Sequence, residues 1–148
     1  MEHRTLDDIK RVADAVPLET TAPRMTRMER LERWAILLEQ HRGGLEPLMR
    51  LEYLPAEERL LQRGDDTPLA VAFRDPALRA QGLAGDRVGD GMAYFELSDH
   101  EAHYLLCDCH YLGALTPTVI AGRVRDVAHR SALRECWDVA RSALIRWR

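Results

Sequence analysis

Residues 98–112 constrain the fold most, because they carry both a start signal and an apolar face typical of a helix. Ser98 and Glu101 form a capping box, in which each side chain accepts a hydrogen bond from the other residue's backbone amide. Gly113 follows, where a glycine can take the left-handed conformation that ends many helices. Small and apolar residues recur at spacings of three and four: Ala102, Leu105, Leu106, Cys109 and Leu112. We therefore predict a helix over residues 98–112 with this face buried.

The opposite face of this predicted helix gathers possible metal ligands, which lie within an arc of about 80° on a helical wheel. They are His100, His103, Cys107 and His110. Imidazole and thiolate together suit zinc, and a haem iron is a further option. Because ten helical residues span about 15 Å, one ion can reach only a subset such as His103 and Cys107. Without a metal, the same residues form an ordinary polar, partly exposed face.

The two cysteines of this segment are predicted to lie on different sides of the helix. Cys109 belongs to the apolar face and acts there as a small buried hydrophobe. A disulfide to Cys107 would be strained, since helical side chains two positions apart diverge by about 200°. An enzyme that uses Cys107 with His103 or His110 is a further alternative, although a nucleophile and its base normally come from separate elements.

Capping and spacing signals predict further helices along the chain. The spacing of residues 5–16 predicts an amphipathic helix that Pro17 ends. Residues 1–24 are therefore predicted to be a helix-and-linker arm and residues 25–148 a single globular domain. Thr26 and Glu29 open a helix that runs to about residue 41. The remaining predicted helices cover residues 55–61, 76–81 and 117–148, the last as one helix or two.

Three segments have the patterns of strands. Residues 49–53 alternate apolar and polar side chains, which favours a strand, with a helical turn as the alternative because of Leu45 and Leu48 upstream. Residues 69–73 are a continuous apolar run, and residues 92–97 are strand-like. Together with the helices they indicate an α+β, predominantly helical fold, with about five or six helices and a small antiparallel sheet of about three strands.

Two loop segments are interpreted as turns rather than as ligand sites. The glycine-rich residues 85–91 precede a predicted strand, whereas a phosphate-binding loop should follow a strand and open a helix. Asp65 and Asp66 form an acidic pair that a cation could bind, but a solvated turn before Pro68 is the simpler interpretation.

Composition and charge narrow the class of protein. Hydrophobic residues make up 46% and charged residues 30% of the chain, as in soluble globular proteins. No apolar run is long enough to span a membrane, and the N-terminus lacks a hydrophobic signal region. With three cysteines of no evident pairing, this leads us to expect a cytoplasmic protein. The net charge of −3 makes nucleic acid an unlikely partner for the chain as a whole.

The C-terminal segment carries the main hint of function. Residues 116–148 contain seven arginines and three acids, a net charge of +4, against −7 for the remainder. Trp137, Leu144, Trp147 and Arg141 are of the types that dominate interface energetics. We therefore expect a small regulatory or adaptor-type module that binds a protein partner or a second copy of itself. A metal-, haem- or redox-responsive protein is the second interpretation, and a Cys/His-dependent enzyme the third.

Overall fold

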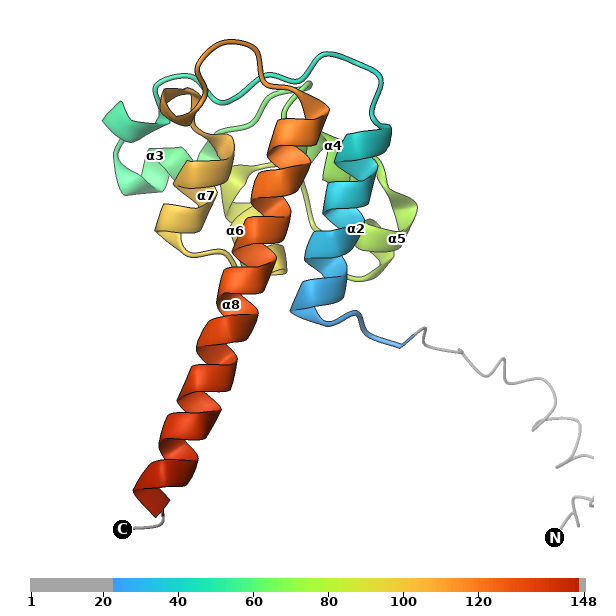
Figure 1. The fold of residues 1–148 in the computed structure, drawn as a ribbon. Coiled ribbons are helices and arrows are strands. Elements are labelled where there is room, and N and C mark those ends of the chain that lie inside the picture. Colours follow the sequence, from blue (N-terminus) through green and yellow to red (C-terminus); the bar gives the residue numbers. More distant parts are fainter. Residues whose placement is uncertain (1–22, 147–148) are drawn as a thin grey trace, which may run out of the picture.

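The computed structural model describes residues 23–146, which form a helical body from which the C-terminal helix projects (Figure 1). The predicted arm over residues 1–24 lies almost wholly outside this range. In chain order the described helices are α2 (Arg27–Gln40), α3 (Ala56–Leu61), α4 (Pro68–Arg74), α5 (Pro76–Ala80), α6 (Val88–Phe95), α7 (Asp99–Leu106) and α8 (Pro117–Arg146). Two short 3-10 turns lie between them, η1 (Leu51–Tyr53) and η2 (Asp108–His110). None of the helices in the described range is long and apolar enough to cross a membrane.

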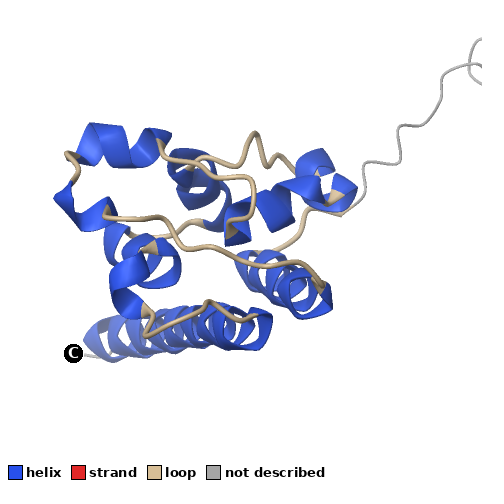
Figure 2. Cartoon of the chain, turned by 90° about the horizontal axis from the view of Figure 1, so that it is seen from above, coloured by secondary structure: helices blue, strands red, loops and turns tan. Residues whose placement is uncertain are grey.

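The predicted small sheet is wrong, because residues 23–146 contain no strand (Figure 2). The apolar run of residues 69–73 lies in α4, where Thr67 caps the helix by accepting a hydrogen bond from the Ala70 amide and Pro68 occupies the first turn. This helix is buried on almost every side, so its sequence shows no helical period and resembles a buried strand. Residues 92–97 likewise lie mostly in α6, and residues 49–53 contain η1. The fold of the described residues is therefore all-helical rather than α+β.

Trp34 connects three helices at the centre of the body. Its ring is fully buried and stacks on Phe95 of α6, with ring centroids 4.5 Å apart and planes 17° apart. Its indole N–H donates to the carbonyl oxygen of Pro68 at the start of α4, at 2.9 Å. Because the N–H group of a buried indole needs a hydrogen-bond acceptor, this bond fixes the start of α4 relative to α2.

Helix α8 is one continuous helix, and only its first half packs on the body, alongside α2 (Figure 1). Ile120, Val124 and Val127 are buried there. On the surface of the same contact, Arg125 binds both Glu32 and Glu39 of α2, at 3.0 Å each. Thr116 caps the start of α8 by accepting a hydrogen bond from the Val119 amide.

Asp75 supplies a pH-dependent contact between α2 and α5. Its carboxylate is almost buried, accepts from the Leu78 amide as the cap of α5, and binds Arg33 through two hydrogen bonds of 2.6 and 2.9 Å. The hydrogen bond from Arg33 holds the pKa of Asp75 below its ordinary value. A lowered folded-state pKa gives stability that is present above the unfolded pKa and is lost as the pH falls through the folded value.

We therefore predict that Asp75→Asn lowers the free energy of unfolding by about 1–2 kcal/mol at pH 7. At pH 3 and below, the difference from the wild type should shrink, because the carboxyl of the unfolded chain then binds a proton more readily than the folded carboxyl does. Urea denaturation at both pH values measures this, with the exposed Asp126→Asn as the matched control. An equal loss at both pH values would contradict the assigned role of the Arg33 contact.

Candidate metal centre

Helix α7 begins where the sequence predicts but ends at Leu106, six residues earlier than expected. The capping box is present, with Glu101 N to Ser98 Oγ at 3.2 Å and Ser98 N to Glu101 Oε2 at 2.9 Å. The prediction of one helix over residues 98–112 is wrong beyond Leu106, because the chain turns to pair with a distant loop. Leu48 N donates to Leu106 O at 2.7 Å, and Asp108 N donates to Leu48 O at 3.1 Å.

This early end reverses the predicted surroundings of the two cysteines. Cys107 adopts an extended backbone and is fully buried, whereas Cys109 in η2 is exposed. Leu112, expected in the buried face, is also fully exposed. The predicted divergence of the two side chains applied only to a continuous α-helix, whereas here the extended Cys107 separates α7 from the 3-10 turn η2 that contains Cys109.

Glu52 reaches the same place from the loop that precedes α3. Arg50, just before η1, has a left-handed backbone with φ 55° and ψ 31°, which is uncommon for a residue other than glycine. Its amide donates to Asp108 Oδ1 at 2.9 Å. The turn places Glu52 against Cys107, whose Sγ donates to Glu52 Oε2 at 2.9 Å. Two backbone segments far apart in the sequence are thus joined at one point.

Four side chains of metal-ligating type converge there. Glu52, His103, Cys107 and Cys109 each offer one ligand atom, and these four atoms lie within 4.8 Å of one another. His103 Nε2 lies 3.8 Å from Cys109 Sγ. A tetrahedral zinc with bonds of 2.0–2.3 Å would hold its ligand atoms about 3.3–3.8 Å apart. Small side-chain movements would therefore bring the four atoms to the geometry of a zinc site.

The other two histidines of the predicted ligand set take different places. His110 Nε2 lies 2.9 Å from His103 Nδ1, behind the imidazole that faces the thiols. Burial, with the neighbouring His103 adding to it, lowers the pKa of His110 and favours its neutral form. His100 is exposed and borders a separate pocket, which is lined by Tyr104 of α7 and by Arg130 and other residues of α8. The structure thus brings His103 and Cys107 together, places His110 behind them, and leaves His100 outside.

Glu52 and Cys109 are the members that sequence reasoning missed. Glu52 lies more than 50 residues before His103, and no spacing pattern connects them. Cys109 was assigned to the buried face of a helix that does not extend that far. The available signal for Cys109 was its position only two residues after Cys107, beside His110.

The protonation of Cys107 follows from its surroundings. Burial raises the pKa of this thiol to about 12, and the hydrogen bond to Glu52 adds to the effect. The same hydrogen bond lowers the pKa of Glu52. Without a metal, Cys107 is therefore a thiol that donates to a carboxylate, which is unfavourable for the alternative of an enzyme with Cys107 as its nucleophile.

Arg123 of α8 holds the segment that carries most of these groups. Its guanidinium donates to the carbonyl oxygens of Tyr104, at 3.3 Å, and His110, at 2.7 Å. It also lies over the Tyr111 ring, 4.1 Å from the ring centroid, a favourable cation–π contact. The α7–η2 segment is thereby fixed to α8 on one side and to the loop around Leu48 on the other.

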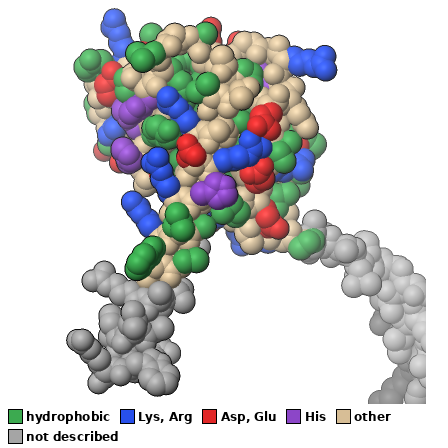
Figure 3. All heavy atoms as spheres, in the orientation of Figure 1, with side chains coloured by type: hydrophobic (Ala, Val, Ile, Leu, Met, Phe, Trp, Pro, Cys, Tyr) green, Lys and Arg blue, Asp and Glu red, His purple; other side chains and the backbone are tan. Residues whose placement is uncertain are grey.

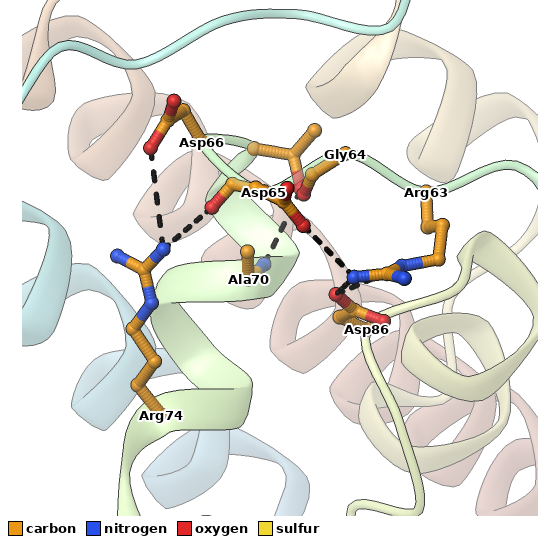
Figure 4. Close-up of polar contacts among 8 residues, drawn as sticks. Arg63, Gly64, Asp65, Asp66, Ala70, Arg74 and Asp86 are labelled. Atoms are coloured by element: carbon orange, nitrogen blue, oxygen red, sulfur yellow. Dashed lines mark hydrogen bonds and ion pairs between the residues drawn. The ribbon is translucent and has the colours of Figure 1, made fainter.

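The acidic pair before α4 is occupied by arginines rather than open to a cation (Figure 4). Arg63 lies between Asp65 and Asp86, at 2.9 and 3.2 Å. Arg74 donates to the carbonyl oxygen of Asp65 at 2.6 Å and lies 4.0 Å from the carboxylate of Asp66. These contacts fit the interpretation of the segment as a turn.

Three of the four predicted partner-binding residues, Trp137, Arg141 and Leu144, are positions of the projecting half of α8. Trp137 has 74% of its surface exposed. Arg141 and Leu144 are positions of the same helix, but their side chains, like the whole of Trp147, lie outside the described part of the chain.

No model of a known protein family matches this chain, and searches of curated proteins and of solved structures also find no match. Arguments about function therefore depend on the geometry described above.

Proposed function

We propose that this protein binds one divalent transition-metal ion, with zinc as the preferred metal, through Glu52, His103, Cys107 and Cys109. The observation that carries the proposal is the convergence of these four groups, from two segments of the chain, within 4.8 Å. Two sulfurs, one imidazole nitrogen and one carboxylate oxygen are a donor set that zinc accepts in tetrahedral geometry.

The ion would link η1 to the α7–η2 segment through its bonds to ligands from both. At present one thiol–carboxylate hydrogen bond joins Glu52 to Cys107, and a cation would replace that proton with bonds to both groups. Glu52 and Cys109 are exposed, so an ion can reach the site from solvent without opening the body. This favours a metal-responsive protein over one whose metal is sealed in the core.

The space on one side of His103 is too small for an organic substrate. The cavity that borders His103, between η1, α3, α6 and α7, measures only about 10 Å³. Small-molecule sites are usually clefts of about 300–1,000 Å³. The pairing of Cys109 with His103 therefore supports metal binding more than nucleophilic catalysis.

We predict that the reduced, untagged full-length protein binds one zinc ion per chain and unfolds at a higher temperature with zinc than with a chelator. Cys107→Ser and Cys109→Ser should each weaken zinc binding by more than about 100-fold, because each removes a direct ligand. Calorimetric titration and metal analysis measure this, with the exposed Cys136→Ser as the matched control. Folded Cys107→Ser and Cys109→Ser proteins that bind zinc as the wild type does would contradict the assignment.

His110 and His100 provide a second matched pair. If His110 only orients His103, His110→Ala should keep one zinc per chain and weaken its binding by about 10–100-fold. His100→Ala should leave the affinity unchanged, because this residue lies outside the cluster. Loss of zinc stoichiometry in His110→Ala, or an equal effect of His100→Ala, would show that the ligand set is different.

A further inference from the structure

The apolar residues of α8 lie on one face of the helix in its first half and on a different face in its second half. In the first half the buried face contains Ile120, Val124 and Val127. At spacings of three and four, the same face continues through the polar residues Ser131, Glu135, Asp138 and Ser142 before it reaches Ile145 near the end of the helix. The second half of α8 is therefore not built to pack on the body as the first half does.

A different face of the second half is apolar. Leu133, Trp137, Ala140 and Leu144 follow the spacings 4, 3 and 4, and lie about 140° around the helix from the buried face of the first half. Leu133 and Trp137 are 62% and 74% exposed. Figure 3 shows hydrophobic side chains on α8 where it leaves the body. Exposed apolar side chains at helical spacing, such as Leu133 and Trp137, are suited to packing against a partner helix.

The first described residues lie beside the root of the projecting half, which we define as Ser131 and Ala132 of α8. A pocket of about 400 Å³ lies between the start of α2 and α8, bordered by Arg24 and Met25 on one side and Ser131 and Ala132 on the other. Residues N-terminal to Arg24 therefore start within reach of α8 just before Leu133.

Residues 5–16 have the properties that this stripe requires. Leu6, Ile9, Ala13 and Val16 share one face at helical spacing. Twelve helical residues are about 18 Å long, close to the length of the stripe from Leu133 to Leu144. Residues 1–22 contain five acids and three bases, whereas residues 133–148 contain four arginines and two acids. The two segments thus match in apolar character, length and charge.

We propose that residues 5–16 form a helix that docks antiparallel on the second half of α8 of the same chain. The direction follows from the connection, because residue 16 is joined by a short linker to the root of the projecting half and residue 5 would lie toward its tip. The second half of α8 is then the binding surface for the chain's own N-terminal segment. This inference is independent of the proposed metal site.

Hydrogen exchange of the full-length protein tests this proposal. We expect the amides of residues 5–16 to exchange at least about tenfold more slowly than an unstructured chain, in a protein that light scattering shows to be a monomer. Ala13→Asp, on the apolar face, should abolish this protection, and Ala15→Asp, on the opposite face, should retain it. Trp137→Ala should remove the protection from the α8 side without altering the exchange of α2.

Three results would overturn the proposal. One is exchange of residues 5–16 at the unstructured rate in the wild type. Another is an equal effect of Ala13→Asp and Ala15→Asp. The third is protection that appears only in a dimer or only with an added protein, which would assign the stripe of α8 to a second copy or to a foreign helix.

Discussion

The contact between α2 and the first half of α8 is the constraint on which the rest of the structure depends. Trp34 on α2 fixes α4 and α6 through its stacked ring and its indole hydrogen bond. Arg123 on α8 fixes the backbone of the α7–η2 segment. Because these two helices pack along each other, the core of the body and the support of the candidate metal centre share one scaffold. The short helices are too short to be stable alone; α4 and α6 pack on α2, and α7 packs on α8.

The parts of the fold that the sequence predicts are those determined by neighbouring residues. The capping boxes of α2 and α7 occur as expected, because each needs only residues three positions apart. The strand prediction for residues 69–73 failed for a physical reason, since a helix buried on nearly all sides loses the 3.6-residue period. The end of α7 failed for another, because Leu48, nearly 60 residues away, takes the backbone partners that decide it.

In the candidate site, too, the residues that the sequence predicts are brought together by local structure, and the residues that it misses are brought in by contacts between distant segments. His103 and Cys107 lie four residues apart, so their proximity could be predicted from helical spacing. Cys109 and Glu52 could not be found in that way. Cys109 joins the group only because α7 ends at Leu106, and Glu52 only because the chain turns at Arg50 and bonds to Asp108. A set of ligands from two segments is what distinguishes this site from a row of polar residues on one helix.

The central claim is that one ion joins these two segments, and X-ray absorption at the zinc edge of the zinc-loaded, full-length protein tests it most directly. The account predicts two sulfur ligands at about 2.3 Å, with one imidazole nitrogen and one carboxylate oxygen at about 2.0–2.2 Å. In Glu52→Gln, a solvent oxygen should replace the carboxylate oxygen among the zinc ligands, and both sulfur ligands should be retained. A first shell of nitrogen and oxygen alone in the wild type would contradict the account, because the ion would then lie elsewhere on the protein.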